Sequence, residues 1–141
     1  MESNAQGNLV SALKMEPGMR LWVGIGDGVI GPGSVRLLAE IGQSGSMALA
    51  AERCGMSYSK AYTLIGRLEG NSGCKLLVRQ SGGASGGKSD LTETARELIS
   101  RYDAFIEALR EPLNAVFAEH FAGFENHDPY EKSPRRKKDG K

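Results

Sequence analysis

The stretch from Gly45 to Leu68, GSMALAAERCGMSYSKAYTLIGRL, constrains the fold of this chain more than any other part. Ser46 and Ser57 each precede a helical pattern, and both suit an N-cap because a serine hydroxyl accepts a hydrogen bond from a free backbone N–H. Between the two patterns stands Gly55, and glycine takes a positive φ without strain. The spacing predicts two helices joined by a tight turn, which is a helix-turn-helix.

The second helix, expected at about 57–70, has two faces of opposite character. Apolar side chains recur on one face at helical spacing, so that face packs inward. The other face carries hydroxyl and cationic groups, which suit a recognition helix in the major groove of DNA. A three-helix domain with a solvated polar face is the alternative. The apolar positions are Ala61, Leu64, Ile65 and Leu68, and the polar positions are Ser59, Lys60, Thr63 and Arg67.

The residues before this motif predict a β-hairpin and a further helix. Apolar residues alternate with other residues through 19–25, Asp27-Gly28 is a hairpin turn signal, and Val29-Ile30 suits the return strand. After the break at Gly31-Pro32-Gly33, an amphipathic helix is expected to end near 42–45. The alternating apolar residues are Met19, Leu21, Val23 and Ile25, and those of the helix are Val35, Leu37, Leu38 and Ile41.

The residues after the motif predict a wing. KLLVRQ at 75–80 suits a strand, and SGGASGGKS at 81–89 has too few apolar side chains to pack, so we expect an exposed, mobile loop. Asp90-Leu91 is expected to begin the return strand, and Thr92 or Thr94 to cap the next helix.

The same glycine-rich loop matches a phosphate-binding motif. Residues 82–89 fit G-x-x-x-x-G-K-[ST], in which backbone N–H groups hold phosphates. That motif opens directly into a helix at its lysine, here Lys88, whereas the cap at Thr92 falls later. No strand ending in aspartate follows to hold a metal ion. We therefore expect a wing, and nucleotide binding through 82–89 is the lesser alternative.

A long apolar stripe runs through residues 93–124 and predicts a dimerisation helix. The stripe is too long for a domain of this size to cover, so a second copy is the natural partner. Folding back onto its own domain is the alternative. Pro112 removes a helical hydrogen bond and predicts a kink or a break. The expected interface residues are Leu98, Tyr102, Phe105, Leu109, Leu113, Val116, Phe117 and Phe121.

Composition excludes little. The 141 residues suit one domain plus an arm, and the net charge is +1, so any DNA-binding surface must be local. Cys54 and Cys74 form no C-x-x-C motif, which favours reduced thiols and a cytoplasmic protein. No signal peptide, membrane span or metal-ligand spacing stands out. We expect a flexible N-terminus at 1–18, a winged domain at 19–92, and a disordered basic tail at 125–141.

Several of these segments together resemble a known family. GPGSVRLLAEIGQSGSMALAAERCGMSYSKAYTLI, LLVRQSGG and GGKSDLTETARELISRY are similar to the N-terminal domain of the molybdate-responsive ModE regulators, and more distantly to LysR-type regulators, over about 20–109. The resemblance implies a winged helix on a palindromic operator. Ser59 stands where the family tends to have lysine, with Lys60 next. The chain stops before the family's C-terminal oxyanion-binding domains, so the resemblance does not support molybdate sensing by this molecule, and the effector is left open.

We therefore expect a mainly α protein with small β-structure (α+β), a homodimeric winged helix-turn-helix regulator that binds double-stranded DNA at the nucleoid. We expect no cofactor, no metal and no enzymatic activity. A separate effector or sensor protein is left open as a partner, and a winged helix that binds only protein is the alternative function. The expected DNA-binding residues are Ser46, Ser57, Tyr58, Ser59, Lys60, Thr63, Arg67, Arg79, Gly82, Gly83, Ser85, Gly86, Gly87 and Lys88.

Overall fold

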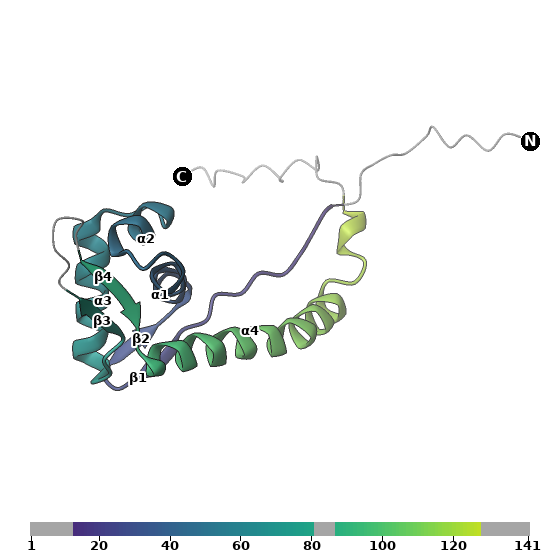
Figure 1. Cartoon of the computed structure of the whole chain (residues 1–141). Coiled ribbons are helices and arrows are strands. Elements are labelled where there is room, and N and C mark those ends of the chain that lie inside the picture. The colour runs from purple at the N-terminus through teal and green to yellow at the C-terminus, as the bar shows by residue number, and fades with distance from the viewer. Residues whose placement is uncertain (1–12, 81–86, 128–141) are drawn as a thin grey trace, which may run out of the picture. The chain divides into compact units, whose positions relative to one another are not determined.

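A computed structural model describes residues 13–80 and 87–127 (Figure 1). The chain divides into two units, one of residues 19–110 and one of residues 1–18 together with 111–141. The expected wing residues Gly82, Gly83, Ser85 and Gly86, the N-terminal residues 1–12 and the tail residues 128–141 lie outside the described part of the chain.

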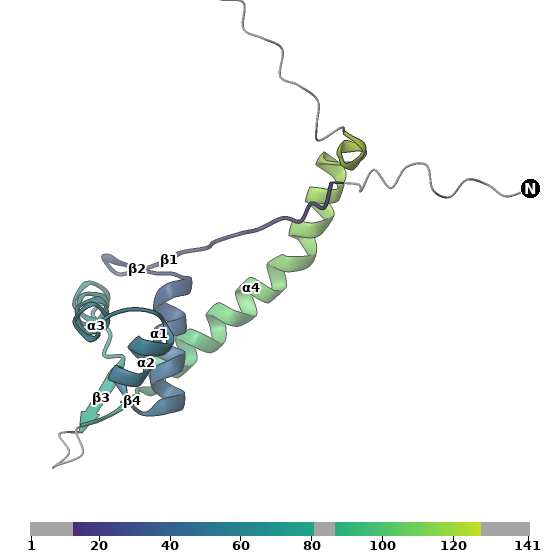
Figure 2. The same cartoon turned by 90° about the horizontal axis from the view of Figure 1, so that it is seen from above.

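Three helices form the body of the unit 19–110: α1 (Pro32–Ser44), α2 (Met47–Arg53) and α3 (Tyr58–Ser72). Figure 1 looks nearly along α1 and Figure 2 nearly along α3, so these two helices cross rather than run side by side. Pro32 occupies the first turn of α1, where its missing N–H costs nothing. α1 ends at Gly45, whose positive φ of 67° suits a glycine C-cap.

Two antiparallel hairpins flank α3 on opposite sides (Figure 2). The first joins β1 (Val23–Ile25) to β2 (Gly28–Ile30), and the second joins β3 (Leu77–Gln80) to β4 (Lys88–Leu91). The second hairpin is the predicted wing. The fold is therefore the expected α+β winged helix with an N-terminal hairpin.

The core of this unit is apolar and lies between the three helices and the hairpins. Both periodic patterns of the sequence contribute, since the predicted inner faces of α1 and α3 are buried. Tyr102, on α4 (Glu93–His120), is also buried, and its hydroxyl donates a hydrogen bond of 2.9 Å to the Leu21 carbonyl oxygen. The largest side chains fully removed from solvent are Ile30, Leu37, Leu38, Ile41, Ile65 and Leu76.

Several element boundaries differ from the sequence prediction. α3 continues past Gly70 to Ser72, where a loop was expected, because Gly73 takes the left-handed C-cap with φ 72°. The first strand covers only Val23–Ile25 of the predicted 19–25, since β2 is three residues long and pairs with no more. The return strand of the wing begins at Lys88 rather than Asp90.

Pro112 does not break the helix. It lies inside α4, which continues to His120, so the predicted break does not occur. The proline deprives the Ala108 carbonyl of its helical partner. Ala108 is exposed, and water can satisfy that oxygen. The remaining hydrogen bonds of a 28-residue helix carry the element through this position.

The C-terminal end of the described chain is aromatic. α4 ends at His120, so Phe121 lies beyond the helix instead of within it, and the predicted helix to 124 is too long. A short 3₁₀ turn, Phe124–Asn126, follows. Phe117, Phe121 and Phe124 form successive ring contacts at 4.9 and 6.0 Å. Within the same unit, the Leu13 N–H donates to the Glu125 carbonyl at 3.0 Å.

Candidate nucleic-acid interface

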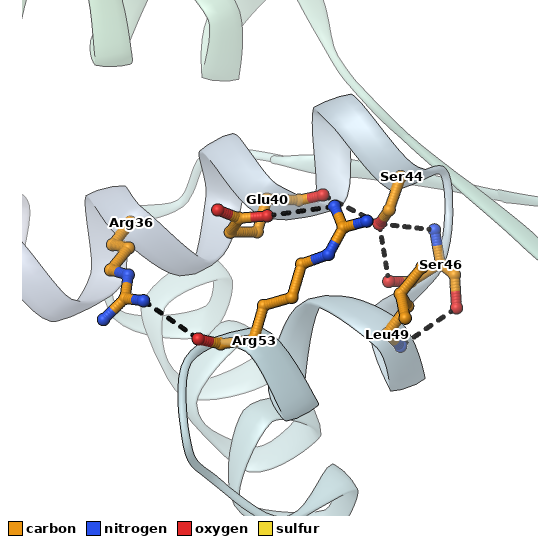
Figure 3. Close-up of polar contacts among 6 residues, drawn as sticks. All are labelled: Arg36, Glu40, Ser44, Ser46, Leu49 and Arg53. Atoms are coloured by element: carbon orange, nitrogen blue, oxygen red, sulfur yellow. Dashed lines mark hydrogen bonds and ion pairs between the residues drawn. The ribbon is translucent and has the colours of Figure 1, made fainter.

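The first helix of the helix-turn-helix is clamped to α1 by polar contacts (Figure 3). The Arg36 guanidinium donates to the Arg53 carbonyl at 2.9 Å, and the Arg53 guanidinium pairs with Glu40 at 3.3 Å. At the other end of α2, the Ser44 hydroxyl accepts the Ser46 N–H at 3.2 Å. Both ends of α2 are held against α1 by these contacts. They therefore also fix the position of the turn between α2 and α3 with respect to α1.

The turn itself is made by local hydrogen bonds. The Gly55 φ is +68°, as predicted from its residue type, and the next N–H, that of Met56, donates to the Ala51 carbonyl at 3.0 Å. The Ser57 hydroxyl then accepts the Lys60 N–H at 3.1 Å and caps α3. In the same way the Ser46 hydroxyl accepts the Leu49 N–H at 3.1 Å. Both serines, expected to bind DNA, therefore use their hydroxyls first as helix caps.

The exposed surface of α3 has a centre and two flanks. Ala61, Ile65 and Leu68 are buried, and with 3.6 residues per turn the side directly opposite them carries small residues. Aromatic residues lie on the flank toward the wing, and cationic residues on the flank toward the β1–β2 hairpin. The central residues are Ser59, Thr63, Gly66 and Gly70, the aromatic flank is Tyr58 and Tyr62, and the cationic flank is Lys60 and Arg67.

A groove separates the cationic flank from the β1–β2 hairpin, and we call it the hairpin-side groove. It has a volume of about 600 Å³. The hairpin is fixed there because the Asp27 N–H donates to the Asn71 carbonyl at 2.8 Å, beyond the predicted end of the helix. Its polar lining is rich in donors and consists of Asp27, Ser34, Ser59, Lys60, Thr63, Arg67 and Asn71.

A second groove lies between α3 and β3, and we call it the wing-side groove. Its volume is about 710 Å³. The Arg79 guanidinium lies over the Tyr62 ring, 4.6 Å from its centroid, and Tyr62 stacks on Tyr58 at 6.2 Å. Its lining residues are Tyr62, Gly66, Glu69, Gly70, Gly73, Cys74, Lys75, Leu77 and Arg79.

Glu69 ties the wing to α3. Its carboxylate accepts the backbone N–H of Leu76 at 2.9 Å and that of Leu77 at 3.5 Å. Glu69 is the acidic residue of α3, and its carboxylate holds the start of β3. The sequence reasoning missed this contact, because the partners lie beyond the end of the predicted helix.

The described end of the wing is a β-strand. Lys88 pairs with Gln80 across the hairpin, and Gly87 and Lys88 are exposed. Ser89 is buried, and its N–H donates to the Gly45 carbonyl at 2.9 Å. In a phosphate-binding loop the lysine and the serine of the motif, here Lys88 and Ser89, begin a helix. Here they open β4, and the helix starts only at Glu93, after the Thr92 cap.

The predicted dimer residues do not share one environment. In the unit 19–110, Leu98 and Tyr102 pack against the domain's own core, whereas Phe105 is 48% exposed. The folding-back alternative is therefore correct for the first turns of α4, and Tyr102 is not available to a partner copy. In the other unit Leu113 and Phe117 are half-buried, and Val116 and Phe121 are exposed.

Three polar residues that line the hairpin-side groove were absent from the predicted site: Ser34, Asp27 and Asn71. Asn71 follows Arg67 by one helical turn, so a longer predicted α3 includes it. Ser34 and Asp27 come from α1 and the hairpin, and no sequence pattern places them beside α3. In the described residues no group of three or more metal-ligating side chains is present. No described helix is long and apolar enough to span a membrane.

This arrangement of elements defines the winged helix-turn-helix class. Residues 33–96 match the family model of bacterial regulatory helix-turn-helix proteins of the lysR family. The chain is 40% identical over 74 residues to the transcriptional regulator ModE of Haemophilus influenzae. This alignment covers 52% of this chain and 29% of the relative. It is 36% identical over 85 residues to the DNA-binding transcriptional dual regulator ModE of Escherichia coli, covering 60% and 32%.

A third relative carries a different name. The chain is 31% identical over 87 residues to the molybdenum-pterin-binding protein MopA of Rhodobacter capsulatus, covering 62% of this chain and 33% of the relative. The chain thus spans about a third of the length of these relatives. Residues 33–96 form a LysR-type helix-turn-helix domain, and the similarity to the two ModE regulators is consistent with an N-terminal DNA-binding domain of the ModE type.

Proposed function

We propose that the chain is a sequence-specific, DNA-binding transcription regulator that acts in the cytoplasm on nucleoid DNA. The observation that carries this proposal is the exposed surface of α3. Its centre bears hydroxyl groups, and one flank bears two cations that make no ion pair among the described residues. A helix of this kind fits the major groove, with the wing on the backbone beside it.

The positions on α3 suggest different tasks for its polar residues. Ser59 and Thr63 lie at the centre, where a helix in the major groove meets the base edges. Their hydroxyl groups can donate hydrogen bonds to the bases or accept hydrogen bonds from them. Lys60 and Arg67 lie on the flank, where the helix meets a phosphate strand. The central residues are therefore proposed to read sequence, and the flanking cations to provide affinity.

A homodimer on a palindromic operator completes the proposal. The Phe105 side chain on α4 is 48% exposed, and an exposed aromatic of this size favours a partner surface. A two-fold dimer repeats α3, and two recognition helices one helical turn of DNA apart read a palindrome. The relatives that are named regulators agree with this proposal.

The test is fluorescence anisotropy with the DNA fragment upstream of the protein's own gene, titrated across salt concentrations with and without competitor DNA. Binding that prefers this fragment and weakens steeply with salt supports the proposal. Each neutralised phosphate makes the slope of log K against log salt more negative by about 0.9. Absence of DNA binding at any salt would leave the protein-interaction alternative. A parallel titration with molybdate tests for an effector.

A further inference from the structure

The strand β1 has one edge that pairs with no other strand of the described residues. β1 pairs with β2, and β2 is the strand of this hairpin that packs on α3. The two-residue turn at Gly26-Asp27 makes Ile25 and Gly28 a hydrogen-bonded pair, so the next residue back, Gly24, directs its N–H and C=O away from β2. We call this side of the strand the β1 edge. Its backbone donors and acceptors are a template for a further strand.

The segment that leads into β1 is held in place by contacts on its inner side. Side chains at 19, 21 and 23 are half-buried and those at 20, 22 and 24 are exposed, which is the alternation of an extended strand. The Tyr102 hydroxyl bonds to the Leu21 carbonyl. The Trp22 ring lies against Gly31, where an added Cβ would come within 2.5 Å of the indole Cδ1. A partner therefore meets an edge that is already ordered, which lowers the entropy cost of binding.

The face beside the β1 edge is apolar and exposed. Trp22 is 63% exposed and Val29 is 56% exposed. Gly24 lies between them in the sheet, opposite Val29, and a Cβ added to it meets nothing within 4 Å. Tryptophan is enriched among the residues that contribute most to binding at protein interfaces. This face can therefore cover alternate apolar side chains of an added strand.

The charge next to this face indicates the sign of the partner. Arg20 precedes Trp22 by two residues, so its side chain lies on the same exposed face. It makes none of the ion pairs of the described residues. A guanidinium matches the two oxygens of a carboxylate. An acidic residue at one end of the added strand is complementary to it.

We propose that the β1 edge binds an extended peptide segment of another protein, apolar at alternate positions and acidic where it passes Arg20. Main-chain hydrogen bonds to Trp22 and Gly24 give the affinity, and the side chains give the specificity. The inference goes beyond the proposed function and does not require DNA. A second copy of this chain fits less well, because a second two-fold contact would join the proposed dimers into an open array.

The test uses Trp22, which is the one tryptophan of the chain, so its fluorescence reports on this edge alone. The probe is a synthetic peptide of alternating valine and threonine with glutamate at one end. A second peptide carries N-methyl groups that remove its pairing donors, and a third has lysine in place of glutamate. We expect the first to shift the Trp22 emission saturably to shorter wavelength. The N-methylated peptide should bind about tenfold more weakly or worse, and the lysine peptide more weakly than the first.

Matched variants of the full chain test the edge itself. Gly24→Pro removes the outward N–H and leaves the bonds between β1 and β2 intact, so peptide binding should weaken about tenfold. Gly24→Ala keeps that N–H and should bind as the wild-type chain does. Arg20→Glu should reverse the preference between the glutamate and lysine peptides, a gain that no loss of folding can imitate. Circular dichroism checks the fold of each variant.

The outcomes separate this inference from its rivals. Equal binding of the N-methylated peptide, or no response of Trp22 to any peptide, overturns it. An unchanged charge preference in Arg20→Glu removes the acidic partner. A dimer of the free chain that Gly24→Pro dissociates, seen by sedimentation velocity, assigns the edge to a second copy and overturns the peptide. If Trp22 responds as expected while the chain binds no DNA, the inference stands and the proposed function falls.

Discussion

The Tyr102 hydroxyl donates a hydrogen bond of 2.9 Å to the carbonyl oxygen of Leu21, 81 residues earlier in the chain. Tyr102 is only 7% exposed, so the bond is largely shielded from water. It ties the first turns of α4 to the segment that leads into the β1–β2 hairpin. A residue with a pattern suited to a dimer interface therefore serves its own domain.

Tyr102→Phe should lower the free energy of unfolding by about 1 kcal/mol, because the Leu21 carbonyl loses its partner while the ring keeps its packing. Tyr102→Ala should cost about 3–5 kcal/mol, since it also leaves a cavity. Urea unfolding at two protein concentrations measures both. If the loss with Tyr102→Phe appeared only at high protein concentration, where association stabilises the folded chain, Tyr102 would belong to a dimer interface instead.

Ser57→Ala should destabilise the domain by about 1 kcal/mol, because the Lys60 N–H at the start of α3 loses its cap. Ser57→Asp should retain most of the stability, since aspartate caps equally well. Ser57→Asp nevertheless places a negative charge near the proposed DNA surface, so its DNA binding should weaken. Denaturant unfolding and anisotropy, measured on the same samples, separate these effects; equal DNA binding by Ser57→Asp would argue against DNA at this end of α3.

Lys60→Ala and Arg67→Ala should weaken binding to all DNA sequences alike, because both residues lie on a flank of α3 that faces the phosphates. Each variant should make the negative slope of log K against log salt shallower by about 0.9. Thr63→Val, at the centre, should instead change the preference among operator sequences, with a cost of about 1–3 kcal/mol at the base it contacts. Anisotropy on a set of single-base operator variants distinguishes the two patterns. The proposed division of tasks fails if the lysine and arginine variants alter sequence preference and the threonine variant does not.

Phe105→Glu should shift the protein from dimer to monomer, because a charge at an exposed aromatic on α4 opposes its burial against a second copy. Phe105 is 48% exposed, so the fold of the domain should survive. Sedimentation velocity measures the shift, and circular dichroism checks the fold. Glu97→Gln, elsewhere on the exposed surface of α4, is the control. An unchanged dimer would place the interface away from Phe105.

Local chemistry in the sequence was enough to predict the helix-turn-helix. Ser46, Gly55 and Ser57 act through neighbours within a few residues, as caps or as a positive-φ turn, and the structure confirms all three. The apolar spacing of α1 and α3 likewise predicted their inner faces. These features depend on helical geometry, which repeats the same way in any protein.

Tertiary contacts decided what the spacing left open. α3 runs past Gly70 because Leu68 is buried, Gly73 caps the end and Asp27 bonds to Asn71. β4 starts early because Ser89 bonds to Gly45, a partner 44 residues away that no local pattern identifies.

The stripe of α4 shows the same division. Its spacing indicated that one face is apolar, but only the fold assigned Leu98 and Tyr102 to the domain's own core and left Phe105 exposed. A hydrophobic pattern states which side of a helix avoids water. Which surface covers that side depends on where distant segments pack, because burial is not directional and any apolar partner of fitting shape can provide it.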